Sequence, residues 1–415
     1  MPILVNVSTL VTCRDEGRQS DLHPVSGGAL VWTDDTIQWV GPKQDIPERF
    51  RSDDQRVDAG GQLVVPGLVD CHTHLAFGGW RADEFEMRCM GRTYQEIAQA
   101  GGGILSTVTA TRTASDEELL DRAEEFVWQT IRLGVTTIEC KSGYGLSLEQ
   151  ELRLLSIYRR LQDRVPVELV PTLLAAHAVP PEVGREKYVE IICNEIIPQS
   201  ADLAEYCDVF VEEGAFTIDE ARRILEAGLR HGLRPKLHAD QLTDSGGARL
   251  AAEVGAASAD HLEYASEDGL AAMADRGVVA VNLPLATLYL RTPTPNARAW
   301  LDAGLSVAVA TDFNPGSAPT YHMPLAMTLA CVQSGMTPAE ALKGATIMAA
   351  KAIDRADRIG SLETGKRADF VLVDATSVNE WLYHFRPNAA SEVYVAGRRI
   401  AGPETPHYAP RGRAT

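Results

Sequence analysis

Eight short apolar runs, each followed by a longer amphipathic stretch, restrict the fold of this chain more than any other feature of its sequence. Such an alternation is typical of βα units that build a parallel sheet. Eight units within about 270 residues predict a (β/α)8 barrel, a fold that typically needs about 250 residues. The runs cover residues 63–74, 135–140, 167–174, 208–211, 235–239, 257–261, 278–283 and 306–312.

The two ends of the chain also carry β-like runs, but neither end has enough strands for a sheet that could stand alone. These runs cover residues 29–32, 36–40, 369–374 and 391–396. We therefore predict an α/β protein in which residues 63–359 form the barrel. Residues 1–62 plus 360–415 are expected to form one small β-sandwich domain beside it.

Charge and composition narrow the function classes. The 415 residues hold 39 basic and 57 acidic side chains, a formal net charge of -18, which argues against a nucleic-acid partner. No segment approaches the roughly 20 apolar residues of a membrane span, and the N-terminus lacks the features of a signal peptide. The seven scattered cysteines favour reduced thiols and a cytoplasmic location.

A His-x-His pair, His72 and His74, closes the first apolar run. Side chains at i and i+2 of a strand point to the same face, so both imidazoles can converge on one ion. They would lie at the C-terminal mouth of the barrel, where barrel enzymes carry their active sites. Two histidines can also serve only for packing, so the pair alone is a weak indication of a metal site.

Three later runs end on further residues that can bind a metal, namely His238, His261 and Asp312. Packing is a poor explanation for such residues at four strand ends, because buried ionisable groups are costly unless they are paired or metal-bound. Three imidazoles and a carboxylate suit zinc first and iron next, rather than magnesium or calcium.

Such an ion brings the pKa of bound water to about 7 and polarises a carbonyl group. The residues therefore predict metal-assisted hydrolysis of a polar carbonyl or amidine bond. Asp312 is the natural proton acceptor. His261 is better placed to polarise the substrate oxygen or relay a proton than to complete the metal coordination.

The chain resembles the amidohydrolase superfamily, and more closely the imidazolonepropionase family, over nearly its whole length. Lys-Ser-Gly-Tyr-Gly at 141–145 and Thr-Asp-Phe-Asn-Pro-Gly at 311–316 are the most diagnostic motifs. The matching stretches are 66–74, 77–81, 141–149, 176–180, 236–240, 310–317 and 360–366. Stretches 66–74 and 360–366 are shared across the superfamily and are only moderately specific.

This resemblance implies that water opens the five-membered ring of 4-imidazolone-5-propanoate to give N-formimidoyl-L-glutamate, the third step of L-histidine degradation. It also implies one zinc or iron ion per chain and an anionic small-molecule substrate. A planar arginine side chain would suit the propanoate carboxylate better than lysine. The implied metal ligands are His72, His74, His238 and Asp312, and the implied substrate contacts are Arg81, Tyr144, His177, Gln241, Asn314, Gly316 and Ser317.

Four of the implied substrate contacts also have a structural explanation. Arg81 lies close in sequence to Asp83, Glu84 and Glu86 and could pair with one of them. Tyr144 and Asn314 lie in turn-rich loops, where such residues are common for backbone reasons. His177 could be a hydrogen-bonded core histidine.

Two positions bear on the mechanism. Members of the resembled family carry Glu or Gln where this chain has Gln241, and an uncharged amide cannot accept a proton at neutral pH. The base role therefore falls on Asp312, and Gln241 is expected to hydrogen-bond the substrate. The run 208–213 contains no lysine of the kind that, once carbamylated, bridges two metals in other amidohydrolases, which favours a mononuclear site.

Two other functions are less consistent with the sequence. A nucleobase-type deaminase needs a proton-delivering glutamate soon after the histidine of the fifth strand, which is His238 here. This chain has Ala239-Asp240-Gln241 at that place, which weakens the deaminase interpretation without excluding it. A non-catalytic scaffold of the same fold should lack metal ligands, yet all four are present. Members of this fold commonly dimerise, so a homodimer is an open expectation.

Overall fold

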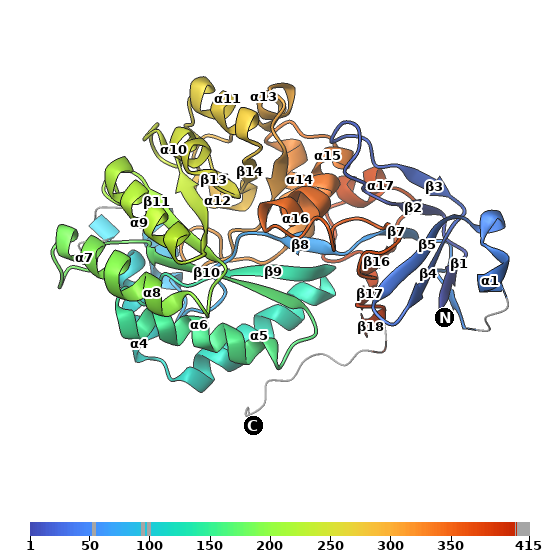
Figure 1. Cartoon of the computed structure of the whole chain (residues 1–415), viewed down its shortest axis with the longest axis horizontal. Coiled ribbons are helices and arrows are strands. Elements are labelled where there is room, and N and C mark those ends of the chain that lie inside the picture. Colours follow the sequence, from blue (N-terminus) through green and yellow to red (C-terminus); the bar gives the residue numbers. More distant parts are fainter. Residues whose placement is uncertain (52–54, 93–95, 98–100, 403, 405–415) are drawn as a thin grey trace.

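The computed structural model describes residues 1–51, 55–92, 96–97, 101–402 and 404. Eight strands form one sheet in sequence order, with neighbouring strands parallel, and helices surround the sheet (Figure 1). The predicted barrel is therefore confirmed. Its strands are β8 (Leu68–Asp70), β9 (Val135–Lys141), β10 (Glu168–Ala176), β11 (Tyr206–Val211), β12 (Arg234–Ala239), β13 (Ser258–His261), β14 (Val279–Asn282) and β15 (Val307–Val309).

The barrel closes between β8 and β15 through the residues that follow these strands. Thr73 and Phe313 form an isolated parallel bridge. The amide of His74 donates to the carbonyl of Phe313 at 2.8 Å, and the amide of Asp312 donates to the carbonyl of His72 at 3.1 Å. Three of the predicted metal ligands thus lie on the seam that closes the barrel.

The helices pack their apolar faces on the barrel. Helix α5, for example, starts with a capping box between Ser115 and Glu118 and buries eight side chains along one face, as expected for an amphipathic helix over a sheet. Within the described residues, the helices of this region are α2 (Ala82–Cys89), α4 (Ile104–Thr113), α5 (Asp116–Arg132), α6 (Leu148–Gln162), α7 (Arg185–Ile191), the π-helix η2 (Ile192–Ile196), α8 (Ile197–Ser200), α9 (Ile218–Arg230), α10 (Gly247–Val254), α11 (Glu267–Arg276), α12 (Pro284–Leu290), α13 (Ala297–Asp302), α14 (Met323–Val332), α15 (Pro338–Lys343), the π-helix η3 (Gly344–Met348) and α16 (Ala349–Ala352).

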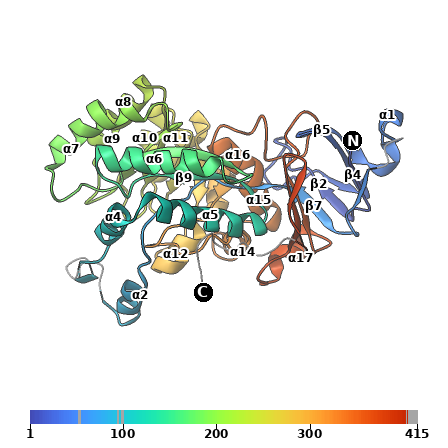
Figure 2. The same ribbon diagram turned by 90° about the horizontal axis from the view of Figure 1, so that it is seen from below.

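Two further sheets lie beside the barrel, and both chain ends contribute to them (Figures 1 and 2). One sheet has the order β5-β4-β1-β6, and the other has the order β18-β17-β16-β7-β2-β3. The elements of this region are β1 (Ile3–Val5), β2 (Thr9–Val11), β3 (Pro24–Ser26), β4 (Gly28–Thr33), β5 (Thr36–Pro42), η1 (Lys43–Asp45), α1 (Glu48–Arg51), β6 (Arg56–Asp58), β7 (Leu63–Pro66), β16 (Phe370–Val373), α17 (Val378–Tyr383), β17 (Ala390–Val395) and β18 (Arg398–Ala401).

Aromatic side chains from both chain ends meet between these two sheets. The Trp32 ring lies 5.2 Å from the Phe370 ring and 6.1 Å from the Tyr394 ring, and Phe370 and Tyr394 stack at 4.3 Å. Large buried aromatic pairs of this kind dominate the stability of a small core. The predicted sandwich of both chain ends is confirmed.

The run 63–74, expected to be a single barrel strand, is divided between two sheets. Strand β7 pairs antiparallel with β16 in the outer sheet, and only β8 belongs to the barrel. His72 and His74 therefore follow the end of β8 instead of lying within a strand. The domain division at residues 62/63 and 359/360 stays a prediction. Among the described residues, no helix has the length and apolar character needed to cross a membrane.

Candidate metal and substrate site

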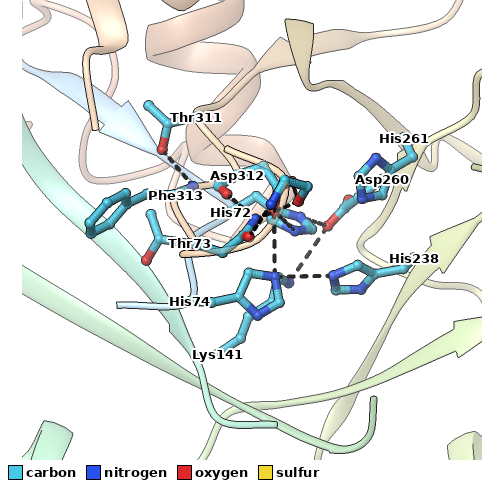
Figure 3. Close-up of polar contacts among 12 residues, drawn as sticks. His72, Thr73, His74, Lys141, His238, Asp260, His261, Thr311, Asp312 and Phe313 are labelled. Carbon is cyan, nitrogen blue, oxygen red and sulfur yellow. Dashed lines mark hydrogen bonds and ion pairs between the residues drawn. The ribbon is translucent and has the colours of Figure 1, made fainter. Parts of the chain in front are cut away.

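The four predicted metal ligands lie together at the carboxyl ends of the barrel strands (Figure 3). Their ligand atoms belong to two groups that could hold an ion, one of His72, His74 and His238 and one of His72, His261 and Asp312. Nε2 of His72 and Nε2 of His74 lie 3.4 Å and 3.5 Å from the same oxygen, Oδ1 of Asp312. Nε2 of His238 lies 3.4 Å from Nε2 of His74. All four side chains are buried, and the assignment of these four residues as the metal ligands stays a prediction.

Two buried carboxylates stand behind the histidines. Oδ2 of Asp260 lies 2.6 Å from Nδ1 of His72, and Oδ1 of Asp208 lies 3.1 Å from Nδ1 of His238. A carboxylate on Nδ1 keeps the proton on that nitrogen and leaves Nε2 free for an ion, which is the usual arrangement around metal-bound histidines.

These side chains fit a divalent ion. Nε2 of His72 is buried and makes no hydrogen bond to any described residue. Burial lowers the pKa of His74 and of His238, so both imidazoles are neutral, as metal binding requires. Burial and the nearby Lys141 lower the pKa of His72, but Asp260 and Asp312 outweigh them and raise it to about 9. The carboxylates of Asp260 and Asp312 therefore make the centre of the cluster a favourable place for a positive charge, such as that of a metal ion.

The loop after β15 is held by the side chain of Asn314. Its Nδ2 donates to the carbonyl of Asp312 at 2.6 Å, and its Oδ1 accepts from the amides of Gly316 and Ser317, each at 2.8 Å. The Ser317 hydroxyl donates to Oδ2 of Asp312 at 3.2 Å. Asn314 thus has the backbone role that its turn-rich loop suggested, and it also lines the cavity of the site.

Arg81 both pairs with a neighbouring carboxylate and faces the cavity. Its Nε and Nη2 donate to Oε2 of Glu84 at 2.8 Å and 2.6 Å. The other oxygen of Glu84 accepts from the amide of Gly103 at 3.0 Å. A Cβ atom on Gly316 would lie 2.2 Å from Nη1 of Arg81, so the absence of a side chain at Gly316 makes room for the guanidinium.

Tyr144 and His177 form an aromatic wall beside His74. The His177 ring stacks on the His74 ring at 5.0 Å, and the Tyr144 ring lies 5.4 Å from that of His177. Burial lowers the pKa of His177 to about 3, so this imidazole is neutral. The turn that carries Tyr144 is shaped by buried Glu151, which accepts from the amides of residues 143, 145 and 146.

A cavity of about 580 Å³ opens at this end of the barrel. It is lined by Gln241, by His261 and by every other predicted site residue except His72, which is fully buried. The cavity therefore brings the predicted metal ligands and the predicted substrate contacts together around one space.

Sequence reasoning missed several residues that shape this site. Arg88 lines the cavity and donates to the carbonyl of Gly316 at 3.2 Å. Glu263 lies beside His261, with Oε1 3.5 Å from Nδ1 of the imidazole. Asp208 and Asp260 lie on barrel strands at positions that face the interior. A charged residue inside an apolar strand is costly unless it is paired, and this pattern could have identified both residues from the sequence.

Comparisons with known proteins agree with this geometry. The model of the amidohydrolase family matches residues 63–400. The imidazolonepropionase of Geobacillus kaustophilus is 49% identical over 390 residues, covering 92% of each chain. The imidazolonepropionase of Symbiobacterium thermophilum is 45% identical over 410 residues, covering 96% of each.

Solved structures show the same fold at low identity. An atrazine chlorohydrolase of Arthrobacter aurescens in complex with zinc has a TM-score of 0.76 at 16% identity, covering 99% of this chain and 97% of its own. An adenosine deaminase of Xanthomonas campestris with bound zinc has a TM-score of 0.72 at 18% identity, covering 97% and 93%.

The barrel, its histidine and aspartate cluster and the matched family model show that the chain belongs to the amidohydrolase family of hydrolases. Within that family, its relatives at 45% and 49% identity over almost their full length place it among the imidazolonepropionases.

Proposed function

We propose that this chain hydrolyses the ring C–N bond of 4-imidazolone-5-propanoate to N-formimidoyl-L-glutamate. We also propose that it does so with one zinc or iron ion held by His72, His74, His238 and Asp312. The observation that carries the proposal is the convergence of these four ligands next to a cavity that Arg81 also lines, in a chain 49% identical to an imidazolonepropionase. A bound ion of this kind acidifies water and polarises a carbonyl group.

The residues of the chain bind and orient the substrate in this proposal. Arg81 offers Nη1 to the propanoate carboxylate, since its Nε and Nη2 are held by Glu84. The neutral imidazole of His177 and the hydroxyl of Tyr144 hydrogen-bond the polar edge of the ring, and the amide of Gln241, which also lines the cavity, does the same. Asn314, Gly316 and Ser317 line the same cavity, with Gly316 next to the guanidinium of Arg81.

Proton transfer falls to Asp312 and His261. Burial alone would raise the pKa of Asp312, but the neighbouring imidazoles of His72 and His74 hold it well below its usual range, so the carboxylate is ionised and can accept a proton. Asp312 takes a proton from the attacking water while the oxygen of that water forms a bond to the ring carbonyl carbon. The C–N bond then breaks, and the nitrogen leaves with a proton delivered from Asp312, while His261 polarises the carbonyl oxygen.

The decisive experiment is an assay of the purified protein on freshly generated imidazolonepropanoate, with metal analysis of the same sample. We expect about one zinc or iron ion per chain and formation of formimidoylglutamate. Asp312→Asn should abolish turnover. Stoichiometric metal together with deamination of a nucleobase, and no turnover of imidazolonepropanoate, would overturn the proposal.

A further inference from the structure

A lysine inside the barrel contacts the carboxylates that stand behind the metal-site histidines. Nζ of Lys141 lies 2.7 Å from Oδ2 of Asp208 and 3.6 Å from Oδ2 of Asp260 (Figure 3 shows Lys141 and Asp260). Nζ also lies 2.8 Å from Oε1 of Glu139. All four side chains have no exposed surface, so their attraction is little screened by water.

The lysine and the two carboxylates that contact the histidines come from alternate strands of the barrel. Lys141 lies on β9, Asp208 on β11 and Asp260 on β13. In a barrel of this kind, side chains from alternate strands point inward at one level and fill one layer of the interior. One ammonium group can therefore reach two carboxylates that are not on neighbouring strands.

Each of these carboxylates holds one histidine. Asp260 contacts Nδ1 of His72 at 2.6 Å, and Asp208 contacts Nδ1 of His238 at 3.1 Å. Asp260 also accepts from the Ser258 hydroxyl at 2.6 Å, and Asp208 also accepts from the amide of His238 at 3.2 Å. Neither donor brings a positive charge, and an uncompensated buried charge is costly. Lys236 lies near enough to Asp260 to act on its charge, but the ammonium group of Lys141 contacts both carboxylates at once.

We propose that Lys141 is a positioning residue of the metal site: through Asp208 and Asp260 it fixes the rings of His72 and His238 so that both Nε2 atoms face one ion. The inference rests on the metal site of the proposed function but not on the substrate. Lys141 also holds this region through its backbone, since its amide donates to the carbonyl of Thr73 at 2.9 Å. A side-chain substitution leaves that contact available.

The test is the zinc affinity of metal-free Lys141→Met, measured by competition with a chromophoric chelator. We expect the affinity to fall about tenfold or more, the range typical when a partner of a metal-bound histidine is removed. The matched control is Lys343→Met. Lys343 is equally buried, but its Nζ donates to the backbone carbonyls of residues 16, 18 and 21, so its loss should cost stability and leave zinc affinity unchanged.

A double-mutant cycle separates positioning from general support. If Lys141 acts through Asp260, the effects of Lys141→Met and Asp260→Asn on zinc affinity are non-additive. Additive effects, or folded Lys141→Met with an affinity within about twofold of the wild type, would overturn the inference. Should Lys141→Met fail to fold, Lys141→Gln is measured in its place.

Each remaining outcome also has a defined meaning. If both Lys141 variants fail to fold while Lys343→Met folds, Lys141 serves stability and the inference is wrong. If the wild-type protein binds no zinc or iron, the proposed function fails first. If the wild type binds one ion and Lys141→Met binds it equally well, only the inference about Lys141 fails.

Discussion

Oε1 of Glu263 lies 3.5 Å from Nδ1 of His261, and the two side chains are 1% and 2% exposed. Among the described residues, neither Nδ1 of His261 nor Oε2 of Glu263 finds a hydrogen-bond partner. The backbone there is unusual, because His261 and Leu262 have φ values of 81° and 64°. Non-glycine residues in this region cost energy and persist where the surroundings demand them. The turn thus places a carboxylate directly behind the imidazole that lines the cavity.

We predict that Glu263→Gln lowers kcat about 100-fold, at the low end of what general acid–base groups contribute. The neutral amide lacks the negative charge that Glu263 places 3.5 Å from Nδ1 of His261, whereas substrate binding does not involve this residue. Steady-state kinetics should therefore show an unchanged KM, and metal analysis should show an unchanged metal content. Glu267→Gln, an exposed change at the start of α11, serves as the control; an unaltered kcat in Glu263→Gln would contradict the role of this pair.

Gly316→Ala should act on KM through Arg81. The added methyl group would lie 2.2 Å from Nη1 of Arg81 and would displace the guanidinium from the cavity. A charge-assisted hydrogen bond contributes about 1.5–3 kcal/mol, so we expect KM to rise about tenfold or more, as in Arg81→Ala, with kcat changing much less. Gly184→Ala is the control, because a Cβ there meets nothing within 4 Å. Equal loss of kcat at constant KM in Arg81→Ala would show that Arg81 does not anchor the substrate.

Glu168, at the start of β10, should make the stability of the protein depend on pH. It accepts hydrogen bonds from Arg355 at 2.8 Å, from Arg358 at 2.9 Å and from Arg367 at 2.6 Å. Burial raises the pKa of Glu168, but these arginines outweigh it and hold the pKa below its ordinary value of 4.5.

A lowered pKa means that the stabilisation is complete above the unfolded-state pKa and is lost as the pH falls through the folded-state pKa. Glu168→Gln should therefore lower the free energy of unfolding of the metal-free protein by about 1.5–3 kcal/mol at pH 7. The difference between the two proteins should begin to shrink as the pH falls below the ordinary pKa of 4.5 and should disappear once the pH lies below the folded-state pKa. Urea unfolding between pH 7 and 3 checks this, with exposed Glu226→Gln as the control. A constant difference across that range would rule out the ionised carboxylate as the cause.

Thiol chemistry should single out Cys89. This cysteine is exposed on α2, whereas burial raises the pKa of Cys13 to about 12 and that of Cys331 to about 11. Thiolates are the reactive form, so a disulfide reagent at pH 8 should titrate one thiol rapidly in the native protein and all seven after denaturation. Cys89→Ser should remove the rapid phase; a rapid phase that persists would mean that a second cysteine is accessible.

The barrel and the metal cluster could be predicted from sequence because both leave local patterns. Each barrel strand is an apolar run, and His238 and His261 stand at or beside the ends of their strands. The roles of Lys141 and Glu263 had no such pattern, since they depend on side chains that meet across the barrel or around a strained turn. Strand β7 was misread for the same reason: an apolar run does not reveal which sheet it joins, and its partner β16 lies far along the chain.

The position of β7 also has a consequence for synthesis on the ribosome. Strand β7 ends at Pro66, and its antiparallel neighbour β16 begins at Phe370. With about 300 residues between them and about 5–20 residues added per second, roughly 15–60 s pass before β16 can emerge. All eight barrel strands are translated within that interval, while β7 has an unpaired edge. Nascent chains of this protein should therefore carry an exposed strand edge until residues 370–373 are made, which makes that edge a place for a chaperone to bind.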